Sequence, residues 1–254
     1  SSMILDEIVS KKIEDLEALK TPKKSLYNVL GTEGISIIAE MKKASPSAGI
    51  IPDELDLVSR IKQYEAGGAK AISVVTEKHF FHGSLAMLKK AQEATSLPLL
   101  RKDFICEPLQ IYESLFAGAD AILIIAALIH DEHELCDFVS LAHHLGMEAL
   151  VEVHEDEELV KAIKSDTKII GFNNRDLTNM TVDIKRCFHL MELFRKLEPD
   201  SQRKIVAESG VKTNDDVKLL EEMGFDGVLI GETLMRSSNP KKTLKALLGD
   251  GACH

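Results

Sequence analysis

Eight short apolar segments alternate with amphipathic segments along the 254-residue chain, and this pattern predicts an α/β fold, a (β/α)8 TIM barrel. The apolar segments do not alternate with polar residues, which is typical of strands buried on both faces of a parallel sheet. A chain of about 250 residues has the usual length of one such barrel. No Gly-x-Gly-x-x-Gly follows any strand, which weighs against a dinucleotide-binding sheet.

The first predicted element is an amphipathic helix over residues 4–19, where apolar side chains recur at helical spacing between charged ones. Residues 1–34 form an N-terminal extension of a single domain that spans 1–254. Strands are then predicted at 35–40, 71–75, 97–101, 121–125, 148–153, 168–172, 204–207 and 227–230. Helices are predicted near 53–66, 84–95, 108–117, 131–145, 155–164, 183–197, 213–223 and 240–248, several of them ending at a glycine.

Composition excludes several functional classes. The net charge is −10 and no basic block is present, so we expect no nucleic-acid partner and no membrane surface. The longest apolar run, 121–129, is shorter than the roughly 20 residues that span a bilayer, and acids stand where a signal peptide would be basic. The four cysteines lack CxxC spacing, which indicates reduced thiols and a cytoplasmic protein. We expect a monomer.

Charged and polar side chains follow most of the predicted strands. They are Glu40 and Lys42, Thr76 and Glu77, Arg101 to Asp103, Glu152, Asn173 to Asp176, Glu208 to Gly210, and Gly231 with Glu232. One charge at a strand end is usually a solvated edge. In a barrel, however, these ends meet at one mouth, where carboxylates and lysines that bury and pair one another suit proton transfer.

The loops after the seventh and eighth strands carry a second signal. Ser209-Gly210 and Gly231-Glu232 leave backbone N–H groups unobstructed, and barrels commonly bind phosphate in these two loops. Ser45 and Ser47 could add hydroxyl donors, although the glycines could equally be turn residues. Two roles are open for Phe104: it packs against other loop residues, or it forms an aromatic wall for a flat substrate. His130 to His133 begin a helix whose dipole accounts for their acids, so no metal site is expected.

Seven blocks of sequence, in this order, resemble the indole-3-glycerol phosphate synthase family over nearly the whole chain. The blocks are IAEMKKASPS (38–47), SVVTE (73–77) with FFHGS (80–84), PLLRKDFI (98–105), LVEVH (150–154), GFNNRDL (171–177), AESG (207–210) and LIGETLM (229–235). The resemblance implies ring closure of 1-(2-carboxyphenylamino)-1-deoxyribulose 5-phosphate to indole-3-glycerol phosphate, with loss of CO2 and water. This is a carboxy-lyase reaction of tryptophan biosynthesis, and no cofactor or metal is implied.

The resemblance also implies roles for individual residues. Lys102 corresponds to the general acid, Glu152 to the partner in later proton transfers, and Glu40 with Lys42 to an assisting and orienting pair. The family's remaining catalytic-site positions correspond to Asn173, Glu208 and Ser209, and its substrate-binding positions to Ser45, Phe104, Arg175, Gly210, Gly231 and Glu232. Within that second group, Phe104 corresponds to the wall against the anthranilate ring, and the serine, the glycines and Glu232 to the phosphate cradle. The N-terminal helix corresponds to one that lies over the barrel mouth.

Two alternatives stay open. Another phosphate-binding barrel, such as phosphoribosylanthranilate isomerase, would be expected to place a cysteine base where this chain has Glu40. A non-catalytic binding barrel would be expected to lack at least one of Lys102, Glu152 and Glu40, all of which are present.

Overall fold

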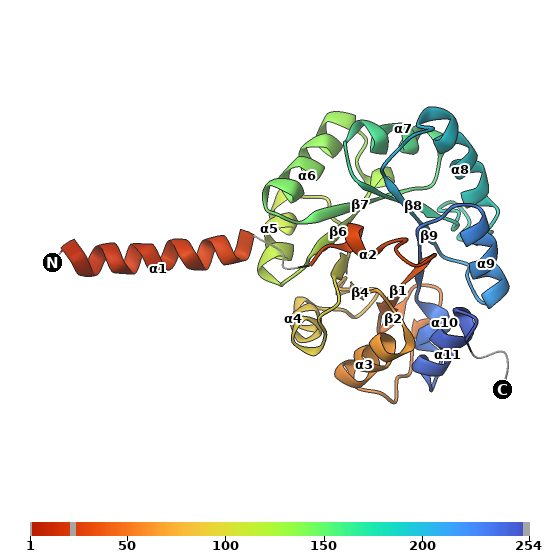
Figure 1. Cartoon of the computed structure of the whole chain (residues 1–254), viewed down its shortest axis with the longest axis horizontal. Coiled ribbons are helices and arrows are strands. Elements are labelled where there is room, and N and C mark those ends of the chain that lie inside the picture. Colours follow the sequence, from red (N-terminus) through yellow and green to blue (C-terminus); the bar gives the residue numbers. More distant parts are fainter. Residues whose placement is uncertain (1, 21–23, 251–254) are drawn as a thin grey trace.

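The computed structural model describes residues 2–20 and 24–250, and shows a closed barrel of eight parallel strands inside a ring of helices (Figure 1). The strands are β1 (Ser36–Met41), β4 (Ala71–Val75), β5 (Leu99–Lys102), β6 (Ala121–Ile125), β7 (Glu148–Val153), β8 (Ile169–Asn173), β9 (Lys204–Glu208) and β10 (Gly227–Ile230). The barrel closes because β1 pairs with β4 on one side and with β10 on the other. The predicted fold class is confirmed. Residues 1, 21–23 and 251–254, which include Cys253, lie outside the described residues.

Each strand is followed by at least one helix. The main ones are α3 (Leu57–Gly67), α4 (Leu85–Ala94), α5 (Pro108–Phe116), α6 (Glu132–His144), α7 (Asp156–Lys164), α8 (Arg186–Leu197), α9 (Asn214–Glu222) and α11 (Pro240–Leu247). The helix predicted from residue 53 begins only at Leu57, because the Asp56 side chain caps it by accepting the Ser59 N–H at 2.7 Å. Asp53 instead pairs with Arg60.

Four short elements were not predicted. They are α2 (Leu26–Val29), the hairpin of β2 (Ala44–Ser45) and β3 (Gly49–Ile50), the 3₁₀ turn η1 (Ala126–Leu128) and α10 (Glu232–Met235). Each is too short to show a hydrophobic period in the sequence. Within the described residues, no helix is both long and apolar enough to cross a membrane.

Apolar side chains pack in two layers. One layer fills the barrel interior, where Ile38, Leu100, Leu150 and Val206 meet, and the other lies between the strands and the helices. Because successive strand residues face opposite sides, Glu40 and Glu152 share the inward face of Ile38 and Leu150. The strands therefore aim their last side chains into the mouth.

The opposite, amino-terminal end of the barrel is closed by α2. Leu26 and Leu30 are buried in the interior layer. Glu148, the first residue of β7, accepts the Leu26 N–H at 2.6 Å and the Ser25 hydroxyl at 2.7 Å. The carboxylate thus binds the start of this short helix and fixes it beneath the barrel.

Helix α1 (Ser2–Lys20) forms as predicted, but its expected placement over the mouth is wrong for this structure. It extends away from the barrel as an arm, and its main contacts are with α5 (Figure 1). Its apolar stripe stays open to solvent, with Ile8 53% and Ile13 50% exposed. Periodicity identifies an apolar stripe on a helix but does not specify which surface covers it.

Candidate active site

Glu40 is the centre of a charged cluster at the mouth. Its buried carboxylate lies 3.0 Å from the Lys102 ammonium and 3.8 Å from that of Lys42. Ser73, on the neighbouring strand β4, donates its hydroxyl to the same carboxylate at 3.0 Å. Partners from β4, from β5 and from the residue after β1 therefore meet at one side chain. Ser73 was not singled out as a site residue by the sequence, although a polar residue inside the apolar run 71–75 could have indicated it.

The two lysines respond differently to this cluster. Burial disfavours the charged form of Glu40, but Lys102 and Lys42 outweigh it and hold the pKa of Glu40 below its ordinary value. Burial also disfavours the Lys102 ammonium, yet the carboxyl groups of Glu40, Glu208 and Glu152 outweigh it and raise the pKa of Lys102. For Lys42 burial dominates and lowers the pKa. The charged form of Lys102 is therefore favoured at neutral pH.

Glu208, the last residue of β9, is the least satisfied group in the mouth. Its side chain is buried, and within the described part of the chain neither carboxyl oxygen has a hydrogen-bond partner. Burial first, and then the nearby Glu152, raise the pKa of Glu208 well above its ordinary value. Burial thus favours the protonated form of Glu208 beside the Lys102 ammonium.

Gly171 on β8 makes room for this acid. A Cβ atom at that position would lie 2.3 Å from Glu208 Oε2 and 2.8 Å from a methyl carbon of Leu150. No larger residue fits without moving Glu208. In the sequence, Gly171 stands out only as the first residue of the block 171–177.

The loops after β9 and β10 line a small cavity of about 100 Å³ beside the cluster. The predicted site residues that line it are Glu40, Lys42, Lys102, Arg175, Ser209, Gly210, Gly231 and Glu232. Ser209 has a left-handed backbone (φ 68°) and donates its hydroxyl to Asn173 Oδ1 at 2.9 Å. The same oxygen accepts the Arg175 N–H at 3.0 Å, so Asn173 ties the two loops together.

Gly231 and Glu232 form the turn into α10. A Cβ atom on Gly231 would lie 2.8 Å from Glu40 Oε1, so the backbone of this turn passes directly over the cluster. Glu232 turns outward to Arg236 at 2.8 Å, and this partner lowers the pKa of Glu232. The Glu232 carboxylate is thus drawn toward Arg236.

Five predicted site residues are not among those that line this cavity: Glu152, Asn173 and Glu208 at the ends of their strands, and Ser45 and Phe104 in loops. Ser45 lies in the β2–β3 hairpin, where its hydroxyl accepts the Ala48 N–H at 3.0 Å and faces Ser47. Phe104, in the loop after β5, is 44% exposed and packs against Phe81 with ring centroids 5.9 Å apart. The two rings form an apolar pair on the loops that follow β4 and β5.

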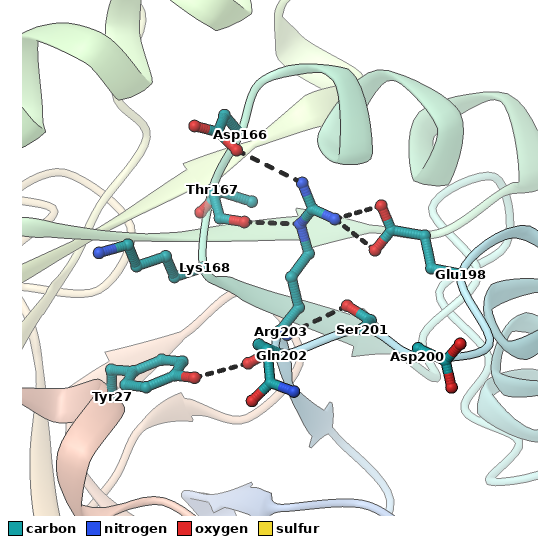
Figure 2. Close-up of a pocket in the computed structure, with 9 residues that line it drawn as sticks. All are labelled: Tyr27, Asp166, Thr167, Lys168, Glu198, Asp200, Ser201, Gln202 and Arg203. Carbon is teal, nitrogen blue, oxygen red and sulfur yellow. Dashed lines mark hydrogen bonds and ion pairs between the residues drawn. The ribbon is translucent and has the colours of Figure 1, made fainter.

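A larger cavity, of about 540 Å³, lies at the other end of the barrel, where β8 and β9 begin (Figure 2). Its central side chain, Arg203, donates to the Thr167 carbonyl at 2.8 Å and pairs with Glu198. Tyr27 donates its hydroxyl to the Gln202 carbonyl at 2.6 Å. These contacts join α2 and the loops before β8 and β9, which is a structural role, so the candidate site is the opposite mouth.

Among the described residues, no group of three or more histidine, cysteine, aspartate or glutamate side chains is arranged to hold a metal ion. The mouth instead offers ammonium groups, carboxyl groups and backbone N–H groups. Such a set can exchange protons with a substrate and hold an anionic group.

Comparison with known proteins points to one family. The family model for indole-3-glycerol phosphate synthase matches residues 4–247. The chain is similar to indole-3-glycerol phosphate synthase from Petrotoga mobilis, 42% identical over 238 residues and 94% of both chains. It is also similar to the protein of that name from Acetivibrio thermocellus, 44% identical over 261 residues, 96% of this chain and 98% of the relative.

Solved structures support the fold. A variant of the tryptophan synthase α-subunit from Pyrococcus furiosus aligns with a TM-score of 0.65 at 16% identity, over 85% of this chain and 98% of that one. Thiamine phosphate pyrophosphorylase from the same organism aligns with a TM-score of 0.62 at 18% identity, over 88% of this chain and 96% of that one. At these identities the likeness concerns the barrel alone.

Proposed function

The chain belongs to the indole-3-glycerol phosphate synthase family, carboxy-lyases of tryptophan biosynthesis, and we propose that Lys102 is the general acid of its ring closure. The substrate is 1-(2-carboxyphenylamino)-1-deoxyribulose 5-phosphate. The observation that carries this proposal is the Lys102 ammonium itself, 3.0 Å from Glu40 and kept charged by three carboxyl groups. An ammonium at the centre of the mouth is in the protonation state that a general acid for a carbonyl oxygen needs.

In the first step the ring carbon that bears the carboxylate attacks the ketone carbon, and Lys102 protonates the ketone oxygen as the new carbon–carbon bond forms. The carboxylate then leaves as CO2, and its electron pair returns to the ring. The new hydroxyl leaves as water with a proton from an acid of the mouth. Glu152 takes up the carbon-bound proton whose loss completes the indole. The balance is one CO2 and one water released per substrate, and one proton taken from solvent, because two protons are donated and one is recovered.

The remaining groups bind and orient. Glu40 holds Lys102, and Lys42 attracts the substrate's carboxylate or phosphate. Glu208 is the second acid of the mouth, and Asn173 organises the loops of Arg175 and Ser209, as their shared hydrogen bonds to Asn173 suggest. The phosphate is bound by Ser45, Gly210, Gly231 and Glu232, the last two through backbone N–H groups. Phe104 faces the anthranilate ring.

The site as proposed needs only one chain and only the substrate, so no cofactor takes part. We propose a cytoplasmic monomer. Light scattering coupled to size exclusion tests the oligomeric state, because a mass near twice the chain's 28.1 kDa would contradict a monomer.

The direct test mixes the protein with the carboxyphenylamino ribulose phosphate and follows indole fluorescence. We expect fluorescence that grows with time and enzyme concentration. A folded protein that binds this compound without producing the signal would be a binding barrel and not a lyase. Turnover of phosphoribosylanthranilate instead would favour the isomerase alternative.

A further inference from the structure

His154 follows the end of β7 and was not singled out as a site residue by the sequence. Its side chain is only 3% exposed, and it lies on the inward face that it shares with Glu152 two residues earlier. Its Nε2 atom is 3.4 Å from Glu152 Oε2, and its Nδ1 atom is 3.5 Å from Glu158 Oε1. The imidazole thus stands between the proposed proton acceptor and a second carboxylate.

Both ring nitrogens are buried, and within the described residues neither makes a complete hydrogen bond. A buried ring nitrogen without a partner is costly, so a group that faces a carboxylate just beyond bonding distance is placed to close on it. Hydrogen bonds at active sites are often long before substrate binds and shorten in the complex. The two long contacts on opposite sides of one ring are consistent with such a preformed arrangement.

The position of His154 is fixed because its backbone is held on both sides and its ring is buried. The His154 N–H donates to Glu158 Oε1 at 2.9 Å, and Arg186 donates to the His154 carbonyl at 3.4 Å. Arg186 is itself fixed by Asp176 at 3.0 Å. Helices α7 and α8 therefore hold the residue in register with Glu152.

We propose that His154 is a positioning residue that acts through Glu152, its Nε2–H donating to that carboxylate while Glu158 holds the His154 backbone N–H. The inference rests on the proposed role of Glu152 as proton acceptor. Donation to a carboxylate favours its ionised form and fixes its orientation. Glu158 fixes the residue beside Glu152 by accepting the His154 backbone N–H at 2.9 Å.

Other charged groups also face this unit. Glu152 lies near Glu208 and Lys102 at the mouth, while Glu158 lies near Lys161 on its own helix. Burial opposes the charge on Glu158, but the nearby His154 ring and the hydrogen bond from the His154 backbone N–H outweigh it and lower the pKa of Glu158. Substitution of His154 leaves Lys102 in place near Glu152. The effect of the substitution can therefore be separated from the effect of losing the general acid.

The test compares pH profiles of kcat for wild type, His154→Gln and Glu158→Gln. Without the Nε2 donor, Glu152 binds its proton more tightly, so the acid limb should move to higher pH by about one unit. In the pH range below that limb kcat should fall about tenfold, while KM changes little. Glu158→Gln should move the limb in the same direction by less. If His154 only stabilised the fold, its substitution would lower stability and leave the acid limb of the kcat profile at its wild-type pH.

His189→Gln is the matched control, because His189 also pairs with a carboxylate, Asp156 at 2.8 Å, but on the exposed surface. It should reproduce the wild-type profile. An unmoved limb in folded His154→Gln would overturn the inference. If that variant does not fold, an unmoved limb in Glu158→Gln, which alters a carboxylate nearer the surface, would overturn it. A wild-type protein without turnover would contradict the proposed function instead.

Discussion

At the scale of single residues, the mouth is a balance of buried charges. Glu40 faces two ammonium groups, Lys42 and Lys102, while burial and Glu152 raise the pKa of Glu208. A raised pKa disfavours the negative charge of Glu208, so the carboxylates and ammonium groups of the mouth come closer to matching in number. A mouth without large net charge can accept an anionic substrate.

Glu208→Gln tests this balance through stability. Because the folded state favours protonated Glu208, its contribution to the free energy of unfolding is greatest at low pH. That contribution falls as pH rises from the ordinary carboxyl range toward the raised pKa. Glutamine removes the titration, so its stability advantage over wild type should grow by up to about 1.4 kcal/mol per pH unit in that window. Tm measured from pH 4 to 8 checks this, and equal Tm differences at all pH values would contradict it.

Lys102→Ala should lower kcat by at least about 100-fold, the low end for loss of a general acid. Lys102→Arg is the matched control, because arginine keeps the positive charge beside Glu40 but replaces the compact ammonium with a planar guanidinium. It should recover stability without recovering kcat. Circular dichroism confirms folding, and near-normal turnover by either folded variant would exclude the role.

At the scale of elements, the turn from β10 into α10 joins the proposed phosphate cradle to the charged cluster. Sequence alone suggests that a side chain on Gly231 would crowd the phosphate and mainly raise KM. The structure adds that its Cβ would lie 2.8 Å from Glu40 Oε1, a carboxylate held by two lysines and Ser73. Binding and chemistry are therefore coupled through this turn.

Gly231→Ala is accordingly expected to raise KM and also to lower kcat, with kcat/KM falling at least about tenfold. A displacement near 1 Å at a catalytic group can cost about 100-fold. Steady-state kinetics separates the two parameters. A rise in KM alone would show that Glu40 accommodates the methyl group without moving.

The length of each element decided whether it could be predicted from the sequence. Strand and helix periods located all eight strand–helix units, with ends within a few residues. They missed α2 and α10, which are too short for a period yet close the floor and shape the cradle. Such turns are held by side-chain contacts from distant parts of the chain, as Glu148 holds α2.

At the scale of the whole molecule, the two N-terminal helices should contribute very differently to stability. The α1 arm exposes its apolar side chains, whereas Leu26 of the α2 segment is buried in the barrel interior. Removal of residues 1–20 should therefore leave Tm nearly unchanged. Leu26→Ala should cost about 2–5 kcal/mol, the usual range for a cavity in a core. Thermal unfolding of both variants checks this, and a large loss of Tm on removing α1 would contradict the exposed arrangement.

The amino-acid sequence by itself determined the barrel and the set of side chains at its mouth. Burial on both strand faces and helical periods are local patterns, and all carboxyl ends of a parallel barrel lie on one side. Only the tertiary structure decided that Lys102 pairs with Glu40 and that Glu208 has no hydrogen-bond partner among residues 2–20 and 24–250. It also decided that His154 stands between Glu152 and Glu158 and that α1 extends outward. These depend on distances between strands and helices far apart in sequence, which barrel closure sets and no local pattern encodes.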